Sequence, residues 1–298
     1  MKESNQNQLL ATKTVKLKTN NSIIRYAELG DKSNPTIILL HGVPENLQAW
    51  YAVAPMLSHN YHVIALDWPG FGGSEPFKST DDYNSQKFAD IVIDFTDTVK
   101  VKQSIILASD IALLPTFLIG LQKPELVSKL IVMDGIPFPR KQYSSWELNS
   151  FTKKGSIISK ALVRWFPSIS SKIVYIKGFH KGHSIPKEVR KEFLDDGKRE
   201  YTMDAFLSYF QNFHIGQTYF EQVAHKLKTP VLVVWGKYDR FINIKLAHEI
   251  VEKLPNARLE IIDKSGHYVH MDKPRELVEA VTKFLSEEPK KAKKQLMI

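Results

Sequence analysis

The 298-residue sequence contains no cysteine. This absence excludes disulfide bonds and thiol catalysis, and it fits a reducing compartment. Long hydrophobic runs are also missing, because no window approaches the roughly 18 apolar residues that a membrane-spanning helix needs. The N-terminal segment Met1–Leu10 is polar and lacks the apolar stretch of a secretory signal peptide. We therefore expect a cytoplasmic protein without a membrane span.

Acidic residues are outnumbered, since 41 Lys and Arg stand against 32 Asp and Glu and give a net charge of +9. Basic residues are frequent between residues 136 and 200, and the C-terminal tail adds further lysines. A nucleic-acid partner would need such charge to neutralise phosphates. The basic residues are scattered singly or in pairs, however, and do not alternate with a pattern of aromatic residues. We expect a solvated charged surface, no nucleic-acid partner and a disordered tail over residues 287–298.

Short apolar runs rich in β-branched residues alternate with stretches of helical spacing. The predicted strands are Ile23–Leu29, Thr36–His41, His62–Asp67, Ser104–Ala108, Lys129–Asp134, Val231–Trp235 and Arg258–Ile262. The predicted helices are Leu47–Leu57, Asp82–Lys100, Ile111–Leu121, Ile244–Leu254 and Pro274–Leu285. This alternation indicates an α/β fold whose mostly parallel sheet carries helices on both faces. Two strands before the first helix predict an antiparallel start to the sheet.

The alternation is interrupted once, between residues 137 and 226, where the sequence is aromatic-rich, helical in spacing and without a strand run. An insertion between two sheet strands predicts a helical lid over the carboxyl edge of the sheet. We therefore expect a core with a first part at 1–136 and a second part at 227–286, with a lid at 137–226 between them.

Ligands bind at the carboxyl ends of the strands in open α/β sheets, so the residues after each strand indicate the site. Five strands end in a polar or glycine-bearing element: His41–Pro44, Asp67–Ser74, Ala108–Ala112, Trp235–Asp239 and Ser265–His267. The last three supply a carboxylate, a second carboxylate and a histidine in that order.

These elements make the chain similar to the α/β-hydrolase superfamily, and in particular to its epoxide hydrolase and haloalkane dehalogenase branch. His41–Pro44 resembles the family's His-Gly-x-Pro turn, and Asp67–Ser74 its Asp-x-Pro-Gly-x-Gly-x-Ser loop with one residue of slack. Trp235–Asp239 and Gly266–His267 resemble its Trp-Gly-x-x-Asp and Gly-His elements. The resemblance covers about residues 20 to 286 and is weakest in the lid. It implies the α/β-hydrolase fold with a helical lid inserted between two strands.

The nucleophile of this fold lies on a strained strand-to-helix turn that needs small residues two before and two after it. Around Asp110 those residues are Ala108 and Ala112, whereas around Ser109 both are bulky. Sterics therefore favour Asp110 over Ser109 as the nucleophile. An aspartate at this position would also serve as an N-cap of the following helix, and that alternative stays open.

An aspartate nucleophile is ionised at neutral pH and can attack saturated carbon to form an alkyl-enzyme ester. Hydrolysis of that ester would need His267 as the base for water and Asp239 as the carboxylate that orients His267. The backbone N–H groups of Val43 and Ile111 would form the oxyanion hole. Such chemistry suits epoxides, alkyl halides and strained lactones.

Other polar residues near the strand ends receive lesser roles. Asp134 is the alternative orienting carboxylate, because some relatives carry it on that strand, although it also reads as a turn residue before a glycine. We expect His41 to be a structural turn residue, and His270 to lie at the surface or behind the site. His180 and His183 lack a third convergent ligand, so we expect no metal and no cofactor.

The resemblance also bears on the leaving group. Haloalkane dehalogenases hold a halide with side-chain donors at the positions of Val43 and Ile111, which have none, so classical dehalogenation is disfavoured. Epoxide hydrolases protonate the opening oxygen with a lid tyrosine, a position that falls here on Phe210. Tyr209 is one residue earlier, a rotation of about 100° on a helix. We take Tyr209 as the preferred lid proton donor. The alternative donors are Tyr143, Tyr175 and His180.

The sequence thus predicts an epoxide hydrolase-like enzyme that acts with water on a small apolar or amphipathic organic substrate. A haloalkane or haloacid dehalogenase-like enzyme and an ester or lactone hydrolase remain alternatives. A catalytically silent protein that binds a small ligand under the lid is the alternative of a different class.

Overall fold

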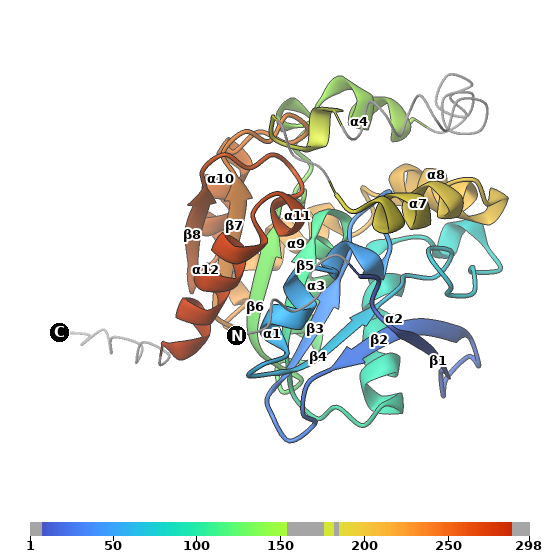
Figure 1. Ribbon diagram of the computed structural model, residues 1–298. Coiled ribbons are helices and arrows are strands. Elements are labelled where there is room, and N and C mark those ends of the chain that lie inside the picture. Colours follow the sequence, from blue (N-terminus) through green and yellow to red (C-terminus); the bar gives the residue numbers. More distant parts are fainter. Residues whose placement is uncertain (1–7, 154–175, 182–184, 288–298) are drawn as a thin grey trace.

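The computed structural model describes residues 8–153, 176–181 and 185–287, and it contains an eight-stranded sheet (Figure 1). The strands follow the order β1-β2-β4-β3-β5-β6-β7-β8. Their bounds are β1 Thr12–Lys16, β2 Ile23–Leu29, β3 Thr36–Leu40, β4 His62–Leu66, β5 Ser104–Ser109, β6 Val127–Met133, β7 Val231–Gly236 and β8 Ala257–Ile262. From β4 onwards in this order the neighbouring strands are parallel. The mostly parallel sheet predicted from the alternation is therefore confirmed.

The antiparallel part differs in detail from the prediction. It consists of β1 against β2 and of β2 against β4, whereas β3 lies between two parallel neighbours. Strand β1 was not predicted, because most of its residues are exposed and polar and it forms the edge of the sheet. An edge strand with one neighbour needs no continuous apolar run.

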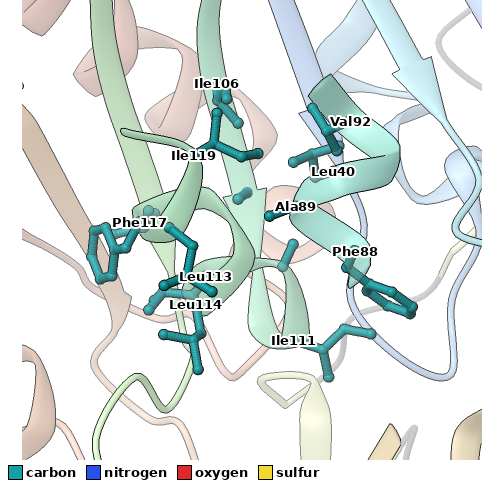
Figure 2. Close-up of a cluster of buried hydrophobic side chains, with 14 of the residues drawn as sticks. Leu40, Phe88, Ala89, Val92, Ile106, Ile111, Leu113, Leu114, Phe117 and Ile119 are labelled. Carbon is teal, nitrogen blue, oxygen red and sulfur yellow. The ribbon is translucent and has the colours of Figure 1, made fainter. Parts of the chain in front are cut away.

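Helices cover both faces of the sheet, as predicted. They are α1 Val53–Leu57, α2 Ser85–Thr98, α3 Leu113–Gln122, α10 Lys245–Lys253, α11 Val269–Asp272 and α12 Pro274–Ser286. In β3, Ile38 and Leu40 pack with α2 and α3, whereas Ile37 and Leu39 pack with α1 and α12. Side chains of a strand alternate between its faces, so each face has its own apolar layer. Figure 2 shows part of the layer formed by α2 and α3.

The predicted helix Leu47–Leu57 is divided in the structure. A 3₁₀ turn at Leu47–Trp50 precedes α1, and Tyr51 N donates to Gln48 O within that turn. The Asn46 side chain accepts a hydrogen bond from Gln48 N and so caps the turn. The tighter i→i+3 bonding of the first turn ends before α1 begins.

Between β6 and β7 the described residues form helices and no sheet strand, with α4 Trp146–Phe151, α7 Lys187–Asp196, α8 Glu200–Asn212 and α9 Gln217–Val223. Helix α9 packs against the sheet side, where Phe220 stacks on Phe117 of α3 at 4.8 Å between ring centroids. Gln217 Nε2 donates a hydrogen bond to the carbonyl of Ile136, 2.9 Å away. The start of α9 therefore lies next to Ile136, three residues after β6 ends.

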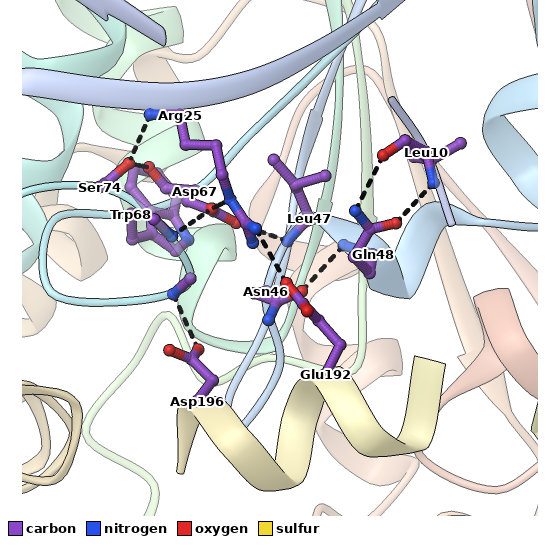
Figure 3. Close-up of polar contacts among 12 residues, drawn as sticks. Leu10, Arg25, Asn46, Leu47, Gln48, Asp67, Trp68, Ser74, Glu192 and Asp196 are labelled. Atoms are coloured by element: carbon purple, nitrogen blue, oxygen red, sulfur yellow. Dashed lines mark hydrogen bonds and ion pairs between the residues drawn. The ribbon is translucent and has the colours of Figure 1, made fainter. Parts of the chain in front are cut away.

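Helices α7 and α8 contact loops at the carboxyl ends of the strands, and Figure 1 shows them above the sheet. Arg25 on β2 forms ion pairs with Asp67 and with Glu192 of α7 (Figure 3). Gly72 N donates to Asp196 Oδ2 at 2.7 Å, and Arg199 donates to the Gly72 carbonyl. These contacts attach α7 to the loop that follows β4. The predicted lid function of residues 137–226 and its boundaries stay predictions, and the tail after Glu287 lies outside the described residues.

Candidate active site

Asp110 lies at the turn between β5 and α3, with a backbone φ of +52°. This left-handed conformation is unfavourable for an aspartate and persists only where the surroundings fix it. The surroundings are tight, because a Cβ on Gly42 would lie 2.7 Å from the Asp110 Cβ, and one on Gly135 would lie 2.4 Å from the Asp110 carbonyl oxygen. Ala108 and Ala112 are fully buried beside the turn. The small neighbours required by the steric argument are therefore in place around Asp110.

Ser109 does not occupy the turn. Its backbone is extended, with φ −117° and ψ 143°, and its side chain is buried at the end of β5. As a whole residue Asp110 is partly exposed, whereas Ser109 is buried, and it is the Asp110 carboxylate that accepts the hydrogen bond described next.

The Asp110 carboxylate accepts a hydrogen bond at Oδ2 from the Val43 backbone N–H, 3.0 Å away. Burial raises the pKa of Asp110 to about 6, and the charge of His267 and the backbone N–H groups of Val43 and Ile111 oppose this rise. The two backbone donors expected from the sequence thus both act on this carboxylate. Oδ1 is left as the oxygen that does not face Val43.

His267 is buried and hydrogen-bonded through Nδ1 to Asp239 Oδ2 at 2.9 Å. Asp239 is itself held at the end of β7, because its Oδ1 accepts from the backbone N–H groups of Phe241 at 2.7 Å and Ile242 at 3.0 Å. Burial lowers the pKa of His267, but the charges of Asp239, Asp110 and Asp134 and the hydrogen bond to Asp239 raise it to about 10. The three side chains expected to form a triad therefore interact electrostatically.

Asp134, the alternative orienting carboxylate, is fully buried at the end of β6 with a φ of +49°. Its Oδ1 accepts from Gly236 N at 3.2 Å, and its Oδ2 has no hydrogen-bond partner among the described residues. Burial and the charge of Asp239 raise the pKa of Asp134 well above its usual range. Asp134 therefore lies next to the His267–Asp239 pair as a carboxyl group that favours its neutral form.

His41 joins two loops, as expected of a turn residue. Nδ1 contacts the Gly42 carbonyl at 2.7 Å, and Nε2 accepts from Trp68 N at 3.2 Å. His270, which was expected to lie at the surface or behind the site, is fully buried and is therefore not a surface residue. Its Nε2 lies 3.2 Å from Oε1 of Glu45, a buried residue that no sequence motif had indicated as part of the site.

Tyr209 of α8 is fully buried and reaches the turn that carries Asp110. Its hydroxyl donates to the carbonyl of Ile111 at 2.9 Å and lies 3.0 Å from Ser85 Oγ. Burial raises the pKa of Tyr209 above its usual value. The hydroxyl is thus committed to a backbone acceptor, which differs from the expected orientation into a free pocket. The neighbouring Phe210 is buried as well.

The other donors considered from the sequence are less clearly placed. Tyr143 packs at the margin of the apolar layer, and the ring of His180 packs against Tyr238 at 4.8 Å between centroids. Tyr175 and His183 lie outside the described residues. Within those described ranges there is no group of three or more residues that could hold a metal ion, and no helix there is long and apolar enough to span a membrane.

Comparison with known proteins places these features in a family. Residues 35–274 match the α/β hydrolase fold family. The chain belongs to this family. It is 24% identical over 292 residues to epoxide hydrolase 3 of Xenopus tropicalis, covering 92% of this chain and 77% of that protein. It is 23% identical to the (E)-2-((N-methylformamido)methylene)succinate hydrolase of Acinetobacter baylyi, covering 94% of this chain and 100% of that protein.

Solved structures with a similar fold also include an epoxide hydrolase. An epoxide hydrolase from metagenomes of hot environments superposes with a TM-score of 0.77 at 18% identity, covering 94% of this chain and 100% of that chain. This likeness supports the α/β-hydrolase fold alone. Together with the family match it makes this chain an α/β-hydrolase whose sequence relatives include epoxide hydrolases.

Proposed function

We propose that this protein is an epoxide hydrolase-like enzyme with Asp110 as its nucleophile. The observation that carries the proposal is the placement of the Asp110 carboxylate on the turn after β5, bonded to Val43 N–H and acted on by the charge of His267. Its epoxide hydrolase relatives favour this substrate class. The substrate would be a small apolar or amphipathic epoxide, and the second reactant water.

In the first step Asp110 Oδ1 attacks a ring carbon, because Oδ2 is held by Val43 N–H. The carbon–oxygen bond of the epoxide breaks and its electron pair passes to the epoxide oxygen. That oxygen takes a proton from the Tyr209 hydroxyl, which gives up its bond to the Ile111 carbonyl. The product is a hydroxyalkyl ester of Asp110. Formation of the ester removes the negative charge of Asp110, which is one of the charges that raise the pKa of His267. The pKa of His267 therefore falls after the ester has formed, and more of its imidazole is in the neutral form that can accept a proton from water.

In the second step His267 removes a proton from water, and the oxygen of that water attacks the carbonyl carbon of the Asp110 ester. Negative charge develops on the carboxyl oxygen held by the N–H groups of Val43 and Ile111. The intermediate collapses, the bond to the alcohol oxygen breaks, and that oxygen takes the proton from His267. The second hydrogen of the water remains on the Asp110 carboxyl and is returned to the Tyr209 oxygen, which restores the starting state. Asp239 keeps His267 in the tautomer with a hydrogen on Nδ1 throughout.

Hydrolysis of a lactone or ester is a second candidate, and one observation favours it. The Tyr209 hydroxyl already donates to the Ile111 carbonyl, so it must exchange that bond to protonate an epoxide oxygen. A lactone or ester needs only the oxyanion hole for its developing charge. The relative from Acinetobacter baylyi is named as a hydrolase of (E)-2-((N-methylformamido)methylene)succinate, a compound that contains no epoxide.

Mass spectrometry of protein incubated with an epoxide tests the proposal. In the variant His267→Gln the ester should form and accumulate on Asp110, because its hydrolysis lacks a base. Asp110→Ala should form no adduct. The proposal is wrong if Asp110→Ala stays active while Ser109→Ala loses activity.

A further inference from the structure

A buried carboxylate and a buried imidazole lie next to each other, close to the loop of the candidate oxyanion hole. Glu45 and His270 are both buried, and Glu45 Oε1 lies 3.2 Å from His270 Nε2. Burial alone would raise the pKa of Glu45, but the charges of His270, His41 and His267 hold it below its usual value. A buried carboxylate is stable only when it is paired or hydrogen-bonded. Glu45 has both kinds of partner.

The second oxygen of Glu45 contacts the loop that carries the oxyanion donor. Glu45 Oε2 accepts a hydrogen bond from Gly42 N at 3.2 Å. The next backbone N–H along the chain belongs to Val43, and it donates to Asp110 Oδ2 at 3.0 Å. The Gly42 Cα is pressed against Asp110, since a Cβ there would lie 2.7 Å from the Asp110 Cβ. Glu45 therefore fixes the peptide immediately before the donor of the oxyanion hole.

His270 connects this loop to the segment that carries His267. It lies on α11, three residues after His267, and its ring packs on Trp50 at 4.7 Å between centroids with an interplanar angle of 37°. The Glu45–His270 contact thus joins the loop of the oxyanion donor to the loop of the proposed base. Neither residue touches the reacting carboxylate directly through a hydrogen bond that the structure describes.

We propose that Glu45 and His270 form a positioning pair that aims the Val43 N–H at Asp110 Oδ2, and that the pair serves hydrolysis of the Asp110 ester rather than its formation. This inference rests on the function proposed above. Before reaction, the Val43 N–H stabilises the carboxylate and makes it a weaker nucleophile. During hydrolysis, the same N–H stabilises the charge that develops on the ester oxygen. Misalignment of Val43 should therefore slow hydrolysis and leave ester formation at least as fast.

The test measures both steps in single turnover with styrene oxide, by quenching and by intact-protein mass spectrometry. Glu45→Ala removes the acceptor for Gly42 N and the charge, so the ester should decay about tenfold more slowly or worse. This factor is smaller than the roughly 10²–10³-fold decrease in rate that follows complete loss of an oxyanion donor, because Val43 N–H would be misaligned and not removed. Glu45→Gln keeps an acceptor without the charge, and His270→Gln replaces the imidazole beside Glu45 with a neutral amide. In both variants the ester should also decay more slowly than in the unchanged protein, but less slowly than in Glu45→Ala.

A matched control is available at the other end of the sheet. Glu28 and His62 form a similar pair, 2.7 Å apart, on β2 and at the start of β4. Glu28→Gln makes the same chemical change as Glu45→Gln away from the strand ends that carry Asp110. It should leave the decay of the ester unchanged.

The outcomes separate the two proposals. Equal slowing of both steps in Glu45→Ala, or no change in either step, would overturn the positioning role. If Glu45→Ala does not fold, the ester decay of Glu45→Gln and His270→Gln decides in its place. Absence of any ester in His267→Gln under the same conditions would refute the proposed function and the positioning pair with it. An ester in His267→Gln without accumulation in the Glu45 variants would refute the pair alone.

Discussion

The two oxygens of the Asp110 carboxylate have different surroundings. Oδ2 is held by the backbone N–H of Val43, and Oδ1 does not face this donor. A buried carboxylate with one fixed oxygen presents the other to a substrate in a defined direction. Reaction rates are sensitive to such alignment of the attacking atom.

Two carboxylates close to His267 can be separated by isosteric substitution. Asp239→Asn removes the charged acceptor for His267 Nδ1 and should slow ester hydrolysis by about 10³-fold or more. Asp134→Asn should change the rate less than about tenfold, because burial already favours the neutral form of Asp134. Single-turnover decay of the ester measures both. A larger loss in Asp134→Asn than in Asp239→Asn would exchange the two roles.

A substitution of Tyr209 distinguishes an epoxide hydrolase from an ester or lactone hydrolase. Protonation of an opening epoxide oxygen by a phenol contributes about 10²-fold or more, so Tyr209→Phe should slow epoxide turnover by that factor. Turnover of an ester or lactone should fall much less, because no alkoxide of that kind forms. Steady-state rates on an epoxide and on a matched lactone provide the measurement. Equal effects on both substrates would show that Tyr209 acts only by packing and by its bond to the Ile111 carbonyl.

Among the secondary-structure elements, those that could be predicted from the sequence are the ones that are buried along their whole length. Strands β3, β4 and β5 are almost wholly buried, so their apolar runs stand out in the sequence. The turn with Asp110 was also predictable, since the steric demand acts on residues two positions away along the chain. Exposed β1 carried no such signal.

Contacts between distant segments could not be predicted in the same way. Glu45 and His270 are 225 positions apart in the numbering (270 minus 45), and nothing in either local sequence indicates the partner. The same holds for Arg25 and Glu192, or Gly72 and Asp196. Such pairs depend on the tertiary arrangement, and a single sequence carries no record of which polar residues meet inside it.

The attachment of α7 to the core gives a prediction at this scale. Asp196 is buried and accepts from Gly72 N at 2.7 Å, so Asp196→Ala leaves that N–H without its acceptor. We expect a loss of about 2 kcal/mol in the free energy of unfolding and faster hydrogen exchange in residues 187–196. The neighbouring Asp195 has a side chain that is 42% exposed, and it forms ion pairs with Lys191 and Lys198 on its own helix and just after it. Asp195→Ala should therefore cost much less, and equal losses would argue against the attachment.

The pH dependence belongs to the molecule as a whole, because several buried charges set it together. Asp110 must be ionised to attack, and its pKa is about 6, so ester formation should fall as the pH drops through about 6. The contribution of Asp110 to the free energy of unfolding changes with pH in the opposite direction to the rate of ester formation. A raised pKa means that the fold favours the neutral acid, so this contribution is present below the unfolded pKa of about 3.9 and is lost as the pH rises through about 6.

Two measurements check this prediction. Single-turnover formation of the ester between about pH 4.5 and pH 8 should show one ionisation near 6. Denaturant unfolding should show that Asp110→Asn gains stability relative to the unchanged protein as the pH rises over the same range. A formation rate that stays constant down to about pH 4.5 would contradict the raised pKa and the role of Asp110 as the attacking group.

The hydrogen bond between Gln217 and the Ile136 carbonyl has a consequence for how such an enzyme can change over evolutionary time. It brings the segment that follows β6 next to the first residue of α9. The two points at which the stretch between these residues joins the rest of the chain therefore lie next to each other. Because its ends are adjacent, a change in the length of this stretch does not require β6 and β7, which pair directly, to change their register. In an enzyme built this way, the sequence of this stretch can change, and substrate preference with it, while the residues at the strand ends keep their positions.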